Sequence, residues 1–155
     1  MKKLILTLLA LSCLLSANEA TNKVVIDLTT SNLKTFEGKI LRGIVAHKNH
    51  YEGNLKELEV AVVIHGGSYK FFVKDLSKTT YKDEKKLIKE QVALQKRIAN
   101  MSQTYNVEFL MCNSGRVKHK LEKENILSFV KYVPNAAIGL IDKQNEGFAY
   151  LPVSN

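Results

Sequence analysis

The chain has 155 residues, enough for one ordinary domain with a substantial core, and it contains no linker, repeat or low-complexity stretch. Its formal net charge is +8, and 45% of its residues are hydrophobic. Acidic residues are interleaved with the lysines and no nucleic-acid binding motif accompanies them, so we predict a solvated basic surface and no nucleic-acid partner. An anionic small molecule and an acidic protein surface stay open as binding partners.

A cleaved export signal is predicted at residues 1–20. Two lysines precede a short apolar run at 4–16, and cleavage is expected after Ala17 or Ala20. The run is shorter than the roughly 20 residues that span a bilayer, which argues against the alternative of a retained membrane anchor. Lipid attachment at Cys13 is a second alternative, and the residues around it match a lipoprotein cleavage site poorly.

The mature chain is expected to form one periplasmic domain over 21–155, without stable membrane insertion. Residues 23–28 are a short β-rich apolar run, which predicts a buried first strand. Thr35 is the predicted N-cap of a helix whose apolar residues recur at helical spacing through 36–47. Residues 60–64 are apolar on both faces, as in a strand that is covered on both sides.

The second strand ends at His65, and a short helical piece is expected through 69–73. Thr80, with Asp83 three residues later, resembles the capping box of a helix. The helix that follows is long, because an apolar stripe at helical spacing continues through 87–101.

A third strand, 106–111, leads directly to Cys112, and a basic helical stretch follows. A fourth strand is expected at 129–133, Asn135 is the predicted cap of the next helix, and a last strand is expected at 148–153. Strands that alternate with helices predict a mostly parallel sheet with helices on both faces. In such sheets, ligands bind at the carboxyl ends of the strands.

Cys112 is the most informative residue, because removal of the signal leaves it as the only thiol. A single cysteine in an oxidising compartment must be buried, paired with another molecule or used. Its place at a strand end, before a turn at 113–115 and a basic string that begins at Arg116, favours thiolate over thiol. A buried inert thiol stays open as the alternative.

His65 lies at the same predicted sheet edge as Cys112. It is a candidate to stabilise the thiolate or to move a proton, since histidine changes its charge near neutral pH. The structural alternative is a strand-end histidine that hydrogen-bonds the turn, with the two glycines after it permitting a tight reversal. For the other three histidines a structural role is predicted: His47, His50 and His119.

Four blocks of the sequence, in this order and spacing, resemble the DsrE/DsrF-like proteins, and most closely their exported branch in sulfur-metabolising bacteria. The blocks are 62–67, 109–115, 133–137 and 144–150. The resemblance implies a three-layer α/β/α domain with a mainly parallel five-stranded sheet that assembles into homo-oligomers. It also implies a sulfur relay, because better understood cytoplasmic members carry sulfur as a persulfide on one cysteine, whose matching position here is Cys112.

The leading hypothesis is a periplasmic sulfur carrier, more a carrier than a turnover enzyme, that holds a persulfide on Cys112 with the help of His65. Its partners are sulfur donor and acceptor proteins or small sulfur anions, and no cofactor is predicted. The residues expected to bind the sulfur donor are Asn113, Ser114, Gly115 and Arg116.

Two other classes of function stay open. The first is metal binding, because soft copper or zinc suits the side chains of Met111, Cys112, His65 and His119. No close-spaced ligand pair supports it, and no metal is predicted. The second is a small-ligand-binding module without sulfur transfer. Hydrolase motifs are absent from the sequence.

Overall fold

The computed structural model of the protein describes residues 21–155, and the predicted export signal and Cys13 lie outside them. The strands are β1 (Asn22–Leu28), β2 (Leu58–Ile64), β3 (Val107–Cys112), β4 (Lys131–Val133) and β5 (Ala149–Val153). The helices are α2 (Leu33–Phe36), η2 (Glu37–Gly43), α3 (Ile44–Glu52), η3 (Ser68–Phe72), η4 (Leu76–Lys78), α4 (Lys85–Gln103), α5 (Asn113–Lys118), η5 (Lys123–Asn125) and α6 (Ala136–Asn145). None of these helices is both long and apolar enough to cross a membrane.

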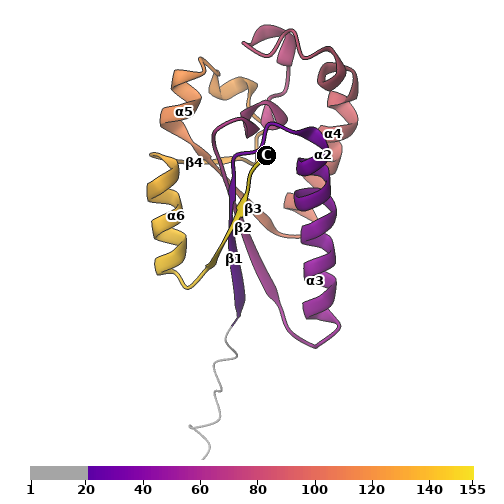
Figure 1. Cartoon of the computed structure of the whole chain (residues 1–155), viewed down its shortest axis with the longest axis vertical. Helices are drawn as coiled ribbons and strands as arrows, with labels where there is room; N and C mark the ends of the chain where they lie inside the picture. The colour runs from indigo at the N-terminus through magenta and orange to yellow at the C-terminus, as the bar shows by residue number, and fades with distance from the viewer. Residues whose placement is uncertain (1–20) are drawn as a thin grey trace, which may run out of the picture.

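The strands form one five-stranded sheet in the order β4-β3-β2-β1-β5, and every neighbouring pair is parallel. Helices α2, α3 and α4 lie on one side of the sheet and α6 lies on the other (Figure 1). The predicted three-layer α/β fold is therefore confirmed, with a sheet that is parallel throughout. All carboxyl ends meet at one edge, and the outermost strands are β4 and β5, the latter containing Pro152.

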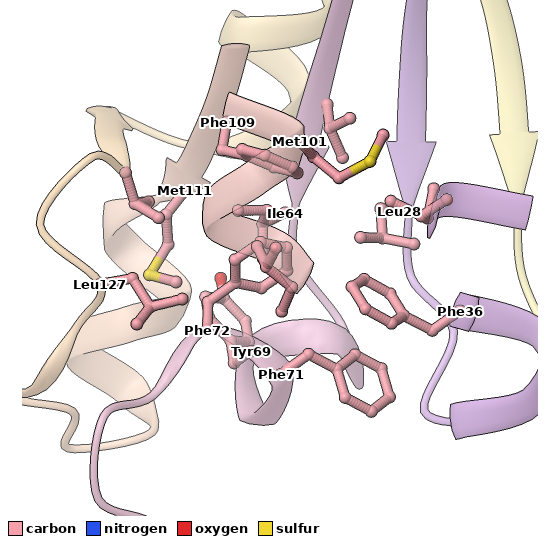
Figure 2. Packing of buried hydrophobic residues seen from close by; sticks show 14 of the residues in the cluster. Leu28, Phe36, Ile64, Tyr69, Phe71, Phe72, Met101, Phe109, Met111 and Leu127 are labelled. Atoms are coloured by element: carbon pink, nitrogen blue, oxygen red, sulfur yellow. The ribbon is translucent and has the colours of Figure 1, made fainter. Parts of the chain in front are cut away.

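The larger core lies between the sheet and the helices α2, α3 and α4. Strand residues alternate between the two faces, so Ile26 and Leu28 enter this core. Aromatic side chains from α2 and η3 pack together in this core, where Phe36 stacks on Phe71 with ring centroids 4.4 Å apart. Tyr69 lies beside these rings with its hydroxyl turned toward the end of β3 (Figure 2). The core therefore fixes the segment η3, which supplies a side chain to the site described below.

The second core is small and lies under α6. Its buried residues are Val25, Ala61, Val63, Leu110 and Phe148. Gly139 lets α6 approach the sheet closely, because a Cβ there would lie 2.9 Å from a methyl group of Val133. Lys143 then pairs with Glu108 of β3 at 2.8 Å. These contacts hold α6 against the sheet, and its first turn follows directly after β4 at the carboxyl edge.

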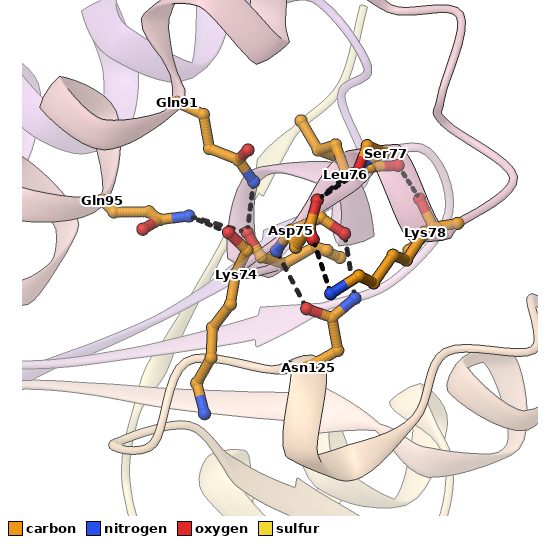
Figure 3. A network of polar contacts seen from close by, with 10 residues as sticks. Lys74, Asp75, Leu76, Ser77, Lys78, Gln91, Gln95 and Asn125 are labelled. Carbon is orange, nitrogen blue, oxygen red and sulfur yellow. Dashed lines mark hydrogen bonds and ion pairs between the residues drawn. The ribbon is translucent and has the colours of Figure 1, made fainter.

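A polar network fixes the segment that follows η3 (Figure 3). Gln91 and Gln95 of α4 both donate hydrogen bonds to the carbonyl of Val73, at 2.9 and 3.0 Å. Asn125 accepts from the backbone N–H of Asp75 at 2.8 Å and donates to its carbonyl at 3.0 Å. These bonds pair backbone groups of an irregular segment that no strand ladder satisfies.

Two predicted helix caps are wrong. The first helix begins earlier than expected, because the side chain of Asn32 accepts the N–H of Thr35 at 3.0 Å, so Thr35 lies inside the helix. The expected capping box of Thr80 and Asp83 does not form, and α4 begins at Lys85 without a side-chain cap. The residues before α4 instead form turns. The N-cap at Asn135 is confirmed.

Candidate functional site

Cys112 is the last residue of β3 and the N-cap of α5. The apolar run of β3 pairs with β2 and β4, which places Cys112 at the carboxyl edge of the sheet. Its Sγ accepts a hydrogen bond from the backbone N–H of Gly115 at 3.4 Å and lies 3.3 Å from the hydroxyl of Ser114. Cys112 is only 6% exposed, but its sulfur faces polar groups.

The N-terminus of a second helix, α6, also lies near the Cys112 sulfur. Strand β4 pairs Val133 with Cys112, and the carbonyl of Pro134 accepts the N–H of Ser114 at 3.2 Å. This brings the first turn of α6 beside the thiol, where the backbone N–H of Ala136 is a further donor to Sγ. The positive end of a helix favours an anion at this place.

Tyr69 approaches the site from the opposite side. It is 1% exposed, and its hydroxyl donates a hydrogen bond to the carbonyl of Cys112 at 3.0 Å. Burial, followed by the contact with the Cys112 sulfur, raises the pKa of the Tyr69 phenol far above its usual value. The hydroxyl therefore stays protonated and acts as a donor.

These neighbours together set the ionisation of Cys112. Burial alone would raise the pKa of the thiol. Hydrogen bonds from the side chains of Ser114 and Tyr69, and from the N–H groups of Gly115 and Ala136, outweigh burial and lower the pKa below its ordinary value. The geometry therefore favours a thiolate, the nucleophilic form of cysteine.

His65 faces Asp27 instead of Cys112. Its Nε2 lies 2.5 Å from Oδ1 of Asp27, and the hydroxyl of Tyr150 donates to the other carboxylate oxygen at 2.7 Å. Ile64 of β2 pairs with Met111 of β3. His65 and Cys112 are the next residues along the chain, so they lie at the carboxyl ends of neighbouring strands. No hydrogen bond joins them within residues 21–155, and the proton-transfer role of His65 stays a prediction.

The four residues predicted to bind the donor form the first turn of α5. Ser114 and Gly115 contact the sulfur. Arg116 instead donates to the side chain of Asn113 at 3.0 Å and to the carbonyl of Leu121. Its guanidinium thus holds the turn together, and its contact with an anionic donor stays a prediction.

Sequence reasoning missed three residues near the strand ends. Tyr69 and Ala136 reach the site only through tertiary packing, and no local pattern marks them. Asp27 did leave a signal, because it is a carboxylate within the otherwise apolar run of β1. A partly buried carboxylate in such a strand needs a hydrogen-bond partner, and His65 is one such partner.

The residues considered for a metal do not come together. Within the described part of the chain, no group of three or more His, Cys, Asp and Glu side chains is placed to hold an ion. His119 packs against the rings of Tyr69 and Tyr81, with centroids 5.1 and 6.2 Å away.

The family model described as the DsrE/DsrF-like family matches residues 22–153. The chain belongs to this family. An uncharacterized protein of Aquifex aeolicus (strain VF5) is 29% identical over 97 residues, which make up 63% of this chain and 41% of that protein. The chain thus spans less than half the length of this relative.

Two solved structures share the fold of this chain. MTH1491 of Methanobacterium thermoautotrophicum, a protein of unknown function, has a TM-score of 0.59 at 16% identity, covering 84% of this chain and 98% of that one. BT1422 of Bacteroides thetaiotaomicron, a conserved protein of unknown function, has a TM-score of 0.55 at 19% identity, covering 90% and 98%. At such low identity these neighbours show the fold alone.

Replacing Asn135 by alanine tests the contribution of α6. The free energy of unfolding, measured in urea, should fall by about 1 kcal/mol, because Oδ1 of Asn135 accepts the N–H of Ile138 at 3.0 Å. Alkylation of Cys112 at neutral pH should also slow, since a frayed first turn no longer holds the N–H of Ala136 on the sulfur. Asn32→Ala removes an equivalent cap on α2 and is the matched control. Equal alkylation rates in the two variants would contradict the role of α6.

Proposed function

We propose that the protein is a sulfur carrier in which Cys112 holds a sulfur atom as a persulfide. One observation carries this proposal. The Cys112 sulfur has four hydrogen-bond donors around it, two from side chains and two from the backbone, and they favour its anion. The family supports the same chemistry, because DsrE-like proteins are generally related to sulfur relay.

The reaction needs no external oxidant or reductant. The Cys112 thiolate attacks the outer sulfur of a donor persulfide, a bond forms between the two sulfurs, and the donor leaves as a thiolate with the electron pair of the broken S–S bond. The outer sulfur keeps its hydrogen. An acceptor thiolate then attacks this outer sulfur, and Cys112 leaves as a thiolate. The cycle ends with Cys112 in its starting form.

Ser114 marks the side from which sulfur would arrive. Ser114 is exposed to solvent, and its hydroxyl oxygen lies 3.3 Å from the Cys112 Sγ. A sulfur atom bound to Cys112 would therefore lie beside an exposed hydroxyl and near the positive start of α6. Small sulfur anions suit this environment, as does the thiolate of a partner protein.

The cellular setting is part of the proposal. The sequence of residues 1–20 supports export, so we place the sulfur transfer in the periplasm. Donor and acceptor would be proteins or small sulfur anions of that compartment. We also expect the carrier to act as a homo-oligomer, as the family resemblance implies.

Exposure of the reduced protein, purified without residues 1–20 so that Cys13 is absent, to inorganic polysulfide tests the carrier function. Intact mass spectrometry should show the gain of one or more sulfur atoms, and an acceptor thiol such as glutathione should remove them. The variant Cys112→Ser should gain none. A wild-type protein that gains no sulfur, or a gain that persists in Cys112→Ser, would end the proposal and leave a small-ligand-binding module as the alternative.

A further inference from the structure

The hydroxyl of Tyr69 has one hydrogen and two acceptors within reach, both belonging to Cys112. It donates to the carbonyl oxygen at 3.0 Å. Its contact with Sγ is also among the causes that lower the pKa of the Cys112 thiol, and it packs against Gly115, whose N–H donates to Sγ at 3.4 Å. Tyr69 is 1% exposed, so water does not compete for this hydrogen. The bond can therefore pass from one acceptor to the other without entry of solvent.

The surroundings leave the phenol little freedom to move. A Cβ on Gly115 would lie only 1.9 Å from the Tyr69 hydroxyl, so the first turn of α5 packs directly on that oxygen. On the other side, the ring of Tyr69 packs against His119. The preceding residue, Ser68, donates to the carbonyls of Leu28 and His65 at 2.9 and 2.7 Å. The hydroxyl oxygen is therefore held in place beside Cys112 before any reaction, and only its hydrogen has to change acceptor.

We infer that the Tyr69 hydroxyl stabilises the Cys112 sulfur as the leaving group when the carried sulfur passes to an acceptor. This inference rests on the proposed carrier function. In the persulfide, Sγ is uncharged and accepts hydrogen bonds weakly, so the hydroxyl stays on the carbonyl. When the acceptor thiolate attacks the outer sulfur, the S–S bond breaks and its electron pair stays on Sγ.

The developing negative charge then draws the Tyr69 hydrogen bond to Sγ, because bonds to charged acceptors are stronger than bonds to a neutral carbonyl. No proton is transferred, since the phenol is a far weaker acid than the thiol. A better stabilised leaving sulfur departs faster. Tyr69 is thus assigned to the release half of the cycle, in which Cys112 changes from uncharged to anionic.

The variant Tyr69→Phe tests the assignment. The protein is first loaded with polysulfide, and release of sulfur to glutathione is followed by intact mass. Release should slow about tenfold, the effect expected for a lost hydrogen bond to a charged group. Tyr105→Phe, a half-buried tyrosine elsewhere in the fold, should release at the wild-type rate. The pH dependence of alkylation should also shift upward in Tyr69→Phe alone, which a purely structural role would not produce.

A second measurement keeps the phenol in place in case the phenylalanine variant does not fold. 3-Fluorotyrosine at position 69 is nearly the same size but is a stronger donor, so release should become faster. A release rate unchanged by both replacements would overturn the role of Tyr69. Failure of the wild-type protein to take up sulfur at all would instead refute the carrier function itself.

Discussion

The reaction of Cys112 with iodoacetamide should reach half its maximal rate at a lower pH than that of a cysteine in an unfolded peptide, because the folded site lowers the pKa of the thiol. In Ser114→Ala the rate at neutral pH should fall about tenfold, since one hydrogen bond to the charged sulfur is lost. The measurement is the rate of loss of free thiol across the pH range.

Ser128→Ala is the matched control, because Ser128 is exposed and makes no side-chain hydrogen bond within residues 21–155. A normal titration in the wild-type protein, or no effect of Ser114→Ala, would contradict the arrangement of donors. The lowered pKa also affects stability. Ionised Cys112 should stabilise the fold fully above the pKa of the unfolded thiol, about 8.5, and this contribution is lost as the pH falls through the lower pKa of the folded state.

Replacing Phe36 by alanine should lower the free energy of unfolding by about 3 to 5 kcal/mol. Phe36 is 0% exposed, stacks on Phe71 and meets Phe72 edge-on with centroids 5.8 Å apart. Truncation leaves a cavity between α2 and η3 that rigid neighbours cannot fill. Urea unfolding measures the loss, and Phe36→Leu should cost clearly less because it fills most of the space.

The same substitution should disturb the site, because Phe71 and Phe72 belong to η3 together with Tyr69. Alkylation of Cys112 in folded Phe36→Ala should therefore respond to pH more like a free thiol. A stability loss below about 1 kcal/mol would show that the aromatic cluster contributes little.

The strands and the position of Cys112 could be predicted because their signals are local. The run 60–64 is apolar on both faces, which only a strand covered by two helical layers requires, and β2 has that place in the sheet. Cys112 follows the next apolar run, so parallel pairing alone sends it to the carboxyl edge. Asn135 was predictable as a cap for the same reason, since its side chain bonds a residue three positions away.

The rest of the site depends on packing between distant segments. Tyr69 lies 43 positions from Cys112, and only the folded chain reveals their hydrogen bond. The partner of His65 was likewise hidden, because Asp27 and His65 meet across two strands. The errors at Thr35 and Thr80 have a different origin. Several polar residues near each helix start can serve as its cap, and the surrounding turns decide between them.

Pro152 limits how copies of this chain can associate. The carbonyl of Val153 accepts the N–H of Thr29 at 3.0 Å, so Val153 turns toward β1 and the backbone of Pro152 turns outward. Proline has no N–H, so a strand of a second molecule that paired with β5 would lack one backbone hydrogen bond at Pro152. We therefore expect that any association between copies of this chain does not continue the sheet across β5.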